Sequence, residues 1–170
     1  MSEGKHCEIE RKYLIAMPDP DFLKSQPGCA IWEIEQIYLT ALPGETLRIR
    51  RVTEAGETRF YKTFKRRLTA LTAEEQEGQI SHTDYEAYRN EADPDRHPIL
   101  KTRFRIPYQN QILEIDLYPF WTDRAVLEIE LDSEAQPTRI PTWLHVLKEV
   151  TADHRYKNVS LAQTVPNDPQ

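Results

Sequence analysis

Residues 8–15 read Glu-Ile-Glu-Arg-Lys-Tyr-Leu-Ile and carry charged side chains at positions 8, 10 and 12. Because side chains along a β-strand point to opposite faces in turn, this spacing predicts a strand with Glu8, Glu10 and Lys12 on one face. Two carboxylates and an ammonium then point the same way. Hard divalent cations such as Mg²⁺ or Mn²⁺ combine carboxylate oxygens with phosphate oxygens. The stretch therefore predicts the floor of a metal–phosphate site.

Like charges recur two residues apart elsewhere in the chain. Acid–apolar–acid segments occupy residues 8–10, 33–35, 114–116 and 128–130, and base–apolar–base segments occupy 48–50 and 103–105. Each segment places two charges of one sign about 6.5 to 7 Å apart on one strand face. This arrangement is expected if acidic and basic strands converge on a polyanion and its metal ions inside a polar-lined barrel. The alternative is that they are solvated faces of strands whose isoleucines form the core, and we keep that interpretation for Glu33 and Glu35.

Short segments with a period of two recur along most of the chain, with prolines at their boundaries. This pattern is typical of an antiparallel sandwich or barrel. The predicted strands cover residues 7–16, 30–40, 46–54, 57–66, 72–80, 99–107, 110–119 and 124–132.

Three short helices are predicted between or after the strands. An Asp and Pro start signal near residues 17–24 predicts the first. Ser81 is a suitable N-cap for a second helix over 82–92. Pro141 opens a third over 141–149, with an apolar side.

Length and composition favour one folded domain. The chain has 170 residues, 39% of them hydrophobic and 29% charged, with a mean hydropathy of -0.69. We expect a single domain over 1–163 and a disordered tail over 164–170. The N-terminus lacks a basic segment followed by an apolar one, and no run of about 18 apolar residues exists, so we expect a cytoplasmic protein without a membrane partner.

Charge and reactive side chains exclude several function classes. The 22 basic and 28 acidic residues give a net charge of -6, which disfavours nucleic acid as a partner. Cys7 and Cys29 have no metal-binding spacing and are expected to be reduced. The five histidines show neither a metal spacing nor a nucleophile–base arrangement, which disfavours covalent catalysis.

The ordered series of charged motifs resembles a known family. Glu-x-Glu-x-Lys at residues 8–12 is similar to the signature of the CYTH superfamily, also called triphosphate tunnel metalloenzymes. Further similar elements follow in the family's order between Glu8 and about Leu161, and the likeness is greatest to small, single-domain, bacterial-type members. These elements are residues 36–39, 48–50, 63–65, 75–77, 101–104, 114–116, 128–131, 149–151 and 155–158.

The resemblance implies a mainly β (α+β) fold, a closed eight-stranded antiparallel β-barrel with a few short helices outside it. Its charged tunnel takes up a triphosphate with a divalent metal. The interior of an eight-stranded barrel is wide enough for its own side chains or one small ligand, which suits a linear phosphate chain.

The resemblance also implies roles for individual residues. The implied metal ligands are carboxylates for Mg²⁺ or Mn²⁺, namely Glu8, Glu10, Asp116, Glu128 and Glu130. The implied phosphate ligands are basic, namely Lys12, Arg48, Arg50, Lys65, Lys101, Arg103, Arg155 and Lys157. Of these sets, we expect Glu128, Glu130, Lys12 and Arg50 to be catalytic. Strand parity favours Lys65 over Lys62, and whether Glu75, Glu77, Glu114 and Arg155 line the tunnel stays open.

The expected reaction is metal-dependent hydrolysis of a terminal phosphoanhydride, with inorganic tripolyphosphate as the preferred substrate. Nucleoside triphosphatase, thiamine triphosphatase and adenylate cyclase activities of the same superfamily are alternatives. A polyphosphate- or organophosphate-binding module without turnover is an alternative of another class. The chain is expected to act as a monomer or a homodimer.

Overall fold

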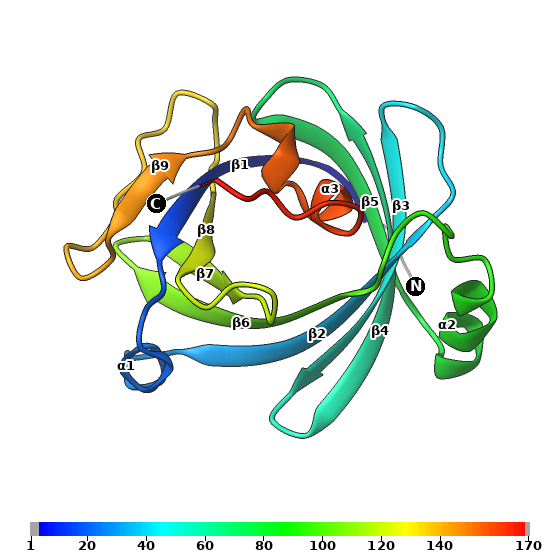
Figure 1. Cartoon of the computed structure of the whole chain (residues 1–170), viewed down its shortest axis with the longest axis horizontal. Helices are drawn as coiled ribbons and strands as arrows, with labels where there is room; N and C mark the ends of the chain where they lie inside the picture. Colours follow the sequence, from blue (N-terminus) through cyan, green and yellow to red (C-terminus); the bar gives the residue numbers. More distant parts are fainter. Residues whose placement is uncertain (1–3, 169–170) are drawn as a thin grey trace.

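The computed structural model describes residues 4–168 and shows a mainly β protein (Figure 1). Its strands are β1 (Gly4–Ala16), β2 (Ala30–Leu39), β3 (Glu45–Glu54), β4 (Glu57–Arg67), β5 (Thr72–Ile80), β6 (Ile99–Tyr108), β7 (Gln111–Leu117), β8 (Arg124–Glu130) and β9 (Val146–Glu149). Its helices are α1 (Pro20–Lys24), α2 (His82–Arg89), the 3₁₀ helix η1 (His154–Tyr156) and α3 (Asn158–Leu161). Within the described part of the chain, no helix has the length and apolar character needed to cross a membrane.

Strands β1 to β8 form a closed antiparallel barrel. Their order around the barrel is β1-β5-β4-β3-β2-β6-β7-β8, and β8 pairs again with β1. Strand β1 closes the ring because its first part, Gly4–Ile9, pairs with β5, while Glu10–Ala16 pair with β8. The predicted eight-stranded closed antiparallel barrel is confirmed.

Strand β9 replaces a predicted helix. The expectation of a helix over 141–149 is wrong, because Val146–Glu149 pair in an antiparallel manner with β1 around Tyr13–Ile15. Strand β5 ends its pairing with β1 at Ile9, which leaves the far part of that edge of β1 open. Unpaired edge groups favour the addition of another strand, and β9 takes that position.

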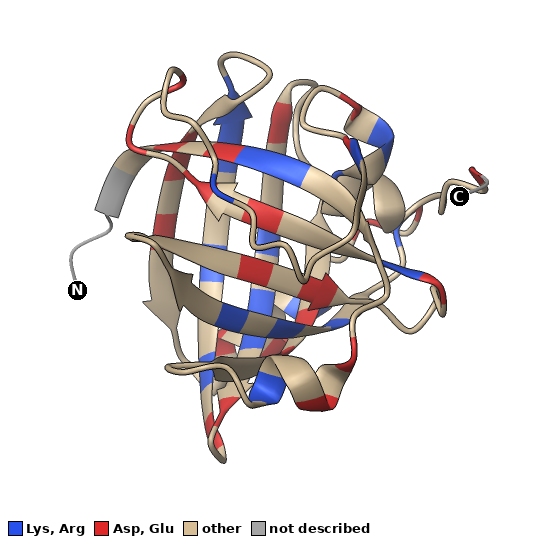
Figure 2. Cartoon of the chain, turned by 90° about the vertical axis from the view of Figure 1, so that its left-hand side faces the viewer, with Lys and Arg blue, Asp and Glu red and all other residues tan. Residues whose placement is uncertain are grey.

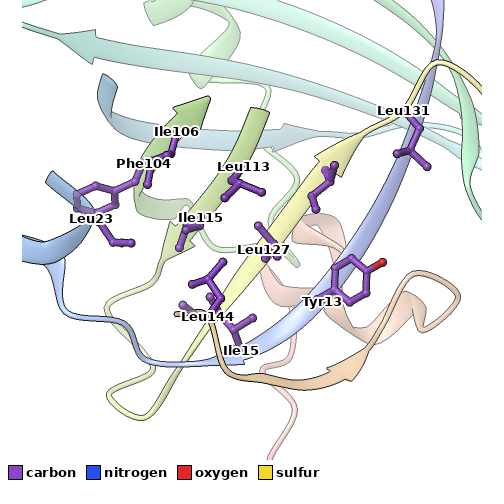
Figure 3. Packing of buried hydrophobic residues seen from close by; sticks show 12 residues of the cluster. Tyr13, Ile15, Leu23, Phe104, Ile106, Leu113, Ile115, Leu127, Leu131 and Leu144 are labelled. Carbon is purple, nitrogen blue, oxygen red and sulfur yellow. The ribbon is translucent and has the colours of Figure 1, made fainter. Parts of the chain in front are cut away.

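The largest apolar cluster lies outside the barrel wall (Figure 3). It joins the outward side chains of β1, β6, β7 and β8 to Leu23 of α1 and to Leu144. Leu127 and Ile129 in this cluster are fully buried. Burial of each such side chain contributes about 1.5 to 3 kcal/mol to folding, so this outer cluster contributes substantially to the stability of the barrel wall.

A second apolar cluster closes one end of the barrel. Residues of the C-terminal segment, including Tyr156 and Leu161, pack against the inward side chains Leu14 and Val126. Figure 1 shows α3 surrounded by the strands. We call this segment, residues 150–162, the plug. It confines the polar part of the interior to the space between the plug and the other end of the barrel.

The first two predicted helices are present. Asp19 caps α1, and the Ser81 side chain accepts a hydrogen bond from the Asp84 amide at the start of α2. Helix α2 ends at Arg89, before the predicted end at residue 92. Of the predicted tail over 164–170, residues 169 and 170 lie outside the described residues, as do residues 1–3 of the predicted domain, so the domain limits stay a prediction.

Candidate active site

A cavity of about 480 Å³ lies between the barrel wall, the plug and the loop of residues 41–46. Its wall is charged with both signs. The charged side chains of the barrel strands that line it are Glu8, Glu10, Lys12, Glu45, Arg48, Arg50, Lys65, Arg67, Arg103 and Glu128. Figure 2 shows acidic and basic residues distributed over neighbouring strands.

Strand parity and register bring these charges together. Lys12 of β1 lies opposite Glu128 of β8, and Glu10 lies opposite Glu130. Because alternate residues share a face, the apolar partners Ile9 and Ile129 point into the outer cluster. The acid–apolar–acid pattern therefore builds a charged interior and an apolar exterior at once.

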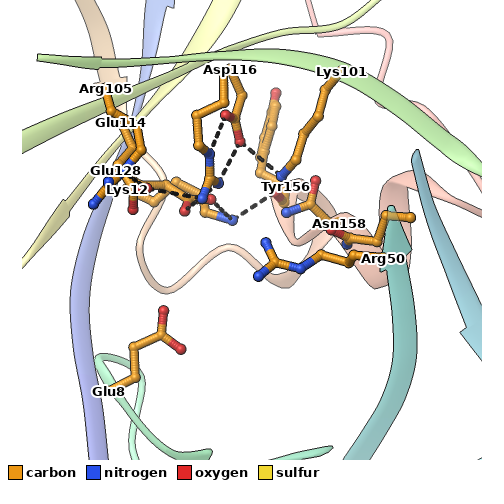
Figure 4. A network of polar contacts seen from close by, with 12 residues as sticks. Glu8, Lys12, Arg50, Lys101, Arg105, Glu114, Asp116, Glu128, Tyr156 and Asn158 are labelled. Atoms are coloured by element: carbon orange, nitrogen blue, oxygen red, sulfur yellow. Dashed lines mark hydrogen bonds and ion pairs between the residues drawn. The ribbon is translucent and has the colours of Figure 1, made fainter. Parts of the chain in front are cut away.

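One ion-pair network joins β1, β6, β7 and β8 (Figure 4). The Lys12 ammonium lies 3.1 Å from Glu128, which lies 3.3 Å from Arg103. Arg103 makes a two-pronged contact with Asp116, with Nε at 2.7 Å and a terminal nitrogen at 2.9 Å. Lys101 lies 2.9 Å from the same carboxylate. These side chains are buried, so their positions are fixed by one another.

The pKa values in this network reflect burial opposed by opposite charge. Burial acts to raise the pKa of Glu128, but Lys12 and Arg103 outweigh it and hold the pKa well below its usual range. Burial lowers the pKa of Lys101 to about 8 in spite of its contact with Asp116. The network therefore keeps the carboxylates of Glu128 and Asp116 ionised, and it brings the pKa of Lys101 close to physiological pH.

A second group of charges lines the wall formed by β1, β3, β4 and β5. The Lys65 ammonium lies 2.6 Å from Glu8 and 3.2 Å from Glu75. Arg50 lies 3.1 Å from Glu77, whose carboxylate also accepts a hydrogen bond from Thr63. Figure 4 shows the Arg50 guanidinium and the Glu8 carboxylate directed into the interior, apart from the Lys12 network.

Three residues whose orientation the sequence left open point into the barrel. Glu75 and Glu77 pair with Lys65 and Arg50, as described above. The Glu114 carboxylate lies 3.0 Å from Arg103 and 3.1 Å from Arg105. All three are thus part of the interior charge network.

Glu10 lies in a locally acidic environment. Burial raises its pKa to about 8, and the carboxylates of Glu128 and Glu8 add to the rise. Glu8 differs: burial acts to raise its pKa, but the Lys65 ammonium holds the pKa below its usual range. Glu10 is therefore a carboxylate whose surroundings supply too little positive charge to keep it ionised.

Buried hydrogen-bond donors without a partner are also present in the cavity. The Nε atoms of Arg48 and Arg50 are buried and have no hydrogen-bond partner within residues 4–168. Burial, together with the positive charges of Arg67 and Lys12, lowers the pKa of Lys157 to about 8. Unsatisfied buried donors are costly, so these groups favour an anionic ligand.

The donor set fits a divalent cation. Glu8, Glu10, Glu128 and Glu130 come from the neighbouring strands β1 and β8. Glu130 is exposed at the end of β8 and does not line the cavity, whereas Glu10 lacks compensating charge. A divalent cation would supply that charge. In the described residues, however, no three acidic, histidine or cysteine side chains are already gathered in a metal-binding arrangement. Asp116 is instead held by Lys101 and Arg103.

Some predicted site residues lie elsewhere. Arg155 is exposed, pairs with Asp153 and Asp168 at 2.7 and 3.1 Å, and does not line the cavity. Lys62 points outward and donates a hydrogen bond to Tyr88, whereas Lys65 lines the cavity. The structure therefore brings Lys157 of the C-terminal segment to the cavity but not Arg155.

Arg67 lines the cavity and was not among the predicted site residues. It lies two residues beyond Lys65 on β4 and therefore on the same strand face. The parity argument that selects Lys65 would have selected Arg67 if the strand had been extended by one residue.

Similarity searches link the chain to characterised proteins. No family model matches the sequence. The chain is 34% identical over 165 residues to an inorganic triphosphatase from Nitrosomonas europaea. The alignment covers 94% of this chain and 99% of that protein.

Solved structures with the same fold were also found. A crystal structure of an inorganic triphosphatase matches with a TM-score of 0.57 and 31% identity, over 94% of this chain and 96% of the other. A protein from Pyrococcus horikoshii shares the fold with a TM-score of 0.58 and 21% identity, over 75% of this chain and 80% of the other.

Proposed function

The chain belongs to the CYTH superfamily of triphosphate tunnel metalloenzymes, and on this premise we propose that it hydrolyses the terminal phosphoanhydride of inorganic tripolyphosphate inside the barrel. The relative at 34% identity is named an inorganic triphosphatase, and the alignment spans nearly all of both chains. The charged cavity supports the same substrate, because its lining offers basic groups to a chain of phosphates.

The observation that carries the proposal is the unmet hydrogen-bonding capacity of Arg48 and Arg50. Both guanidinium groups line the cavity, and both have a buried Nε without a partner in the described chain. Phosphate oxygens accept two-pronged hydrogen bonds from guanidinium groups. A bound triphosphate would therefore satisfy donors that the protein leaves open.

We assign the metal role to Glu8, Glu10, Glu128 and Glu130, with Asp116 beside them through its contacts to the same basic residues. Mg²⁺ or Mn²⁺ is the proposed ion, since both take carboxylate and phosphate oxygens. When bound, such an ion neutralises phosphate oxygens and lowers the pKa of a water molecule.

The basic side chains hold the substrate and stabilise charge. The proposed phosphate ligands are six basic residues that line the cavity, Lys12, Arg48, Arg50, Lys65, Arg103 and Lys157, together with Lys101, which pairs with Asp116 and does not line the cavity. Arg155 remains a prediction from resemblance that its exposed position does not support. In phosphoryl transfer, negative charge spreads over the equatorial oxygens, so Lys12 and Arg50 would act mainly by electrostatic stabilisation. Glu128 and Glu130 would orient the attacking water, and no covalent intermediate with the protein is required.

The proposed setting is the cytoplasm, with a small-molecule triphosphate as the partner. Cys7 and Cys29 are free thiols, which suits a reducing compartment. The net charge of -6 opposes binding of nucleic acid through its phosphate backbone. A monomer or a homodimer is compatible with the closed barrel, which offers few free strand edges.

The test is phosphate release from tripolyphosphate, ATP and thiamine triphosphate, each with Mg²⁺, Mn²⁺ or EDTA. We expect fastest release from tripolyphosphate, loss of release in EDTA, and loss in Glu10→Gln. Glu33→Gln is the matched control, because Glu33 is exposed on the outer face of β2, where it accepts a hydrogen bond from Thr102. Faster release from ATP or thiamine triphosphate would reassign the substrate, and cyclic AMP formation would reassign the reaction.

A further inference from the structure

An uncharged polar residue of the plug also lines the cavity. Asn158 is the first residue of α3, and its side chain is buried. It follows directly on Lys157, and both residues belong to the cavity lining. Figure 4 shows Asn158 among the polar side chains of the interior. Its amide group therefore borders the same space as the proposed phosphate ligands.

The orientation of the Asn158 amide is fixed by Tyr118. The Tyr118 hydroxyl donates a hydrogen bond of 2.6 Å to Oδ1 of Asn158. Tyr118 directly follows β7, is buried, and packs edge to face against Trp121 with ring centroids 5.6 Å apart. Burial and the carboxylates of Asp116 and Glu128 raise the pKa of Tyr118 well above its usual range. The hydroxyl therefore keeps the proton that it donates.

The contact with Tyr118 leaves the amide nitrogen of Asn158 as an open donor. Within residues 4–168, the Nδ2 atom has no hydrogen-bond partner. An amide group has its acceptor on the oxygen and two donor hydrogens on the nitrogen. Because the oxygen is engaged by Tyr118, Asn158 offers the cavity its donor and not its acceptor.

A neutral donor suits this position in the cavity. The oxygens of an ionised phosphate chain only accept hydrogen bonds, so the nitrogen of the amide complements them and the oxygen would not. Burial and the positive charges of Arg67 and Lys12 already lower the pKa of the neighbouring Lys157. An amide adds a hydrogen bond to the phosphate chain without adding to this repulsion between like charges.

We propose that Asn158 is a further substrate ligand, which donates a hydrogen bond from Nδ2 to a phosphate oxygen, and that Tyr118 is the positioning residue that orients its amide. The proposal rests on the proposed function, because it assumes that the cavity holds phosphates. Since Asn158 belongs to the plug, the same contact connects the bound phosphate chain to the segment that closes the barrel.

The experiment is a double-mutant cycle of Tyr118→Phe and Asn158→Leu. Tripolyphosphate affinity is measured by calorimetry in EDTA, where no metal-dependent turnover occurs, and stability is measured by urea unfolding without phosphate. We expect Asn158→Leu to weaken binding about tenfold and Tyr118→Phe to weaken it about threefold. The double variant should bind as weakly as Asn158→Leu alone, because an absent amide cannot be oriented.

Tyr13→Phe is the matched control, since the Tyr13 hydroxyl lies 2.7 Å from Thr138 and its ring belongs to the outer apolar cluster. It should leave the affinity unchanged. Tyr118→Phe removes one oxygen and keeps the ring, so it tests the proposal even if Asn158→Leu weakens the fold.

Lower stability of Tyr118→Phe and Asn158→Leu with unchanged affinity would overturn the proposal and leave Asn158 as an anchor of the plug. Additive weakening in the double variant would overturn the positioning role of Tyr118. Absence of phosphate release from tripolyphosphate by wild type would count against the proposed hydrolysis, while the affinities in EDTA would still decide the role of Asn158.

Discussion

The Lys12 ammonium donates a hydrogen bond of 3.3 Å to the main-chain carbonyl of Tyr156. Lys12 belongs to the barrel wall, and Tyr156 belongs to the plug that closes one end of the interior. The same ammonium lies 3.1 Å from Glu128. One buried cation therefore connects the charged cavity to the segment that closes it, and an anion that attracts Lys12 competes with the contact to the plug.

Replacement of Lys12 should destabilise the fold. Lys12→Met leaves the Glu128 carboxylate buried, with Arg103 as its remaining close cation at 3.3 Å, and removes the hydrogen bond to the plug. Removing one partner of a buried ion pair costs about 3 kcal/mol or more. Urea unfolding of the phosphate-free protein should show this decrease in the free energy of unfolding.

Arg11→Met is the control for this variant. Arg11 is the neighbouring residue on the outer face of β1, and it pairs with Glu149 at 2.7 Å in a part-exposed position. Because such pairs contribute about 1 kcal/mol or less, this variant should retain nearly all its stability. Equal destabilisation by the two substitutions would mean that the buried pair has no special role.

Replacement of Arg50 should reduce catalysis far more than stability. Arg50 lines the cavity and has an unpartnered buried Nε in the described chain. Loss of one preorganised group that stabilises transition-state charge costs about 2 to 4 kcal/mol. Arg50→Ala should therefore lower kcat/KM for tripolyphosphate by roughly 30- to 1,000-fold. Arg66→Ala, on the outer face of β4, should leave kcat/KM unchanged, and a similar loss in both variants would argue against a site inside the barrel.

Triphosphate affinity should fall as the pH rises through 8. Burial and the charges of Arg67 and Lys12 lower the pKa of Lys157 to about 8, whereas an unfolded chain keeps the lysine protonated to about pH 10.4. Between these values the unfolded state binds more protons, so this group makes stability rise with pH. Triphosphate affinity changes with pH in the opposite direction to stability, because phosphate favours the protonated amine of Lys157, which is lost above pH 8.

Lys157→Arg tests this pH dependence. Arginine stays protonated across the range, so the variant should lose less affinity than wild type between pH 7 and 9.5. The difference at pH 9.5 should be about tenfold, measured by calorimetry with tripolyphosphate in EDTA. Parallel pH profiles for the two proteins would show that Lys157 does not contact the phosphate chain.

Divalent metal should stabilise the folded protein. Glu10 lies near Glu8 and Glu128, and its raised pKa reflects burial and their negative charge. At ten times its dissociation constant, Mg²⁺ should add about 1.4 kcal/mol of stability, visible as a higher Tm than in NaCl of equal ionic strength. Glu10→Gln should lose this gain and Glu33→Gln should keep it. An identical Tm increase in the two variants would place the metal elsewhere.

The strands could be predicted from sequence because alternation is a local property, whereas the closed barrel was implied by the resemblance to a known family. The pairs 8 and 10, 48 and 50, and 128 and 130 each select one face of a strand, and the structure directs Glu8, Arg48 and Glu128 into the cavity. Strand β9 could not be predicted in this way. Pro141 and the apolar residues after it fit a helix start, but the open edge of β1 that pairs with Val146–Glu149 arises only once the barrel closes.

Most residues of the site could be predicted from the sequence, but the contacts between their side chains could not. The resemblance implies that Asp116 and Glu128 face inward, yet it does not say that Arg103 lies between them or that Lys101 also holds Asp116. Spacing within one segment likewise could not distinguish Lys157, which lines the cavity, from Arg155, which pairs with Asp153 outside it. Such choices depend on contacts between distant parts of the chain.

The most direct test of the account is phosphate release from tripolyphosphate by wild type and Glu10→Gln, with Mg²⁺ and with EDTA. The account predicts release by wild type in Mg²⁺, none above background in EDTA, and a loss of at least 100-fold in Glu10→Gln, on the order expected when a group essential to transition-state stabilisation is removed. Wild-type protein that binds tripolyphosphate but releases no phosphate with Mg²⁺ or Mn²⁺ would contradict it and indicate a binding module instead.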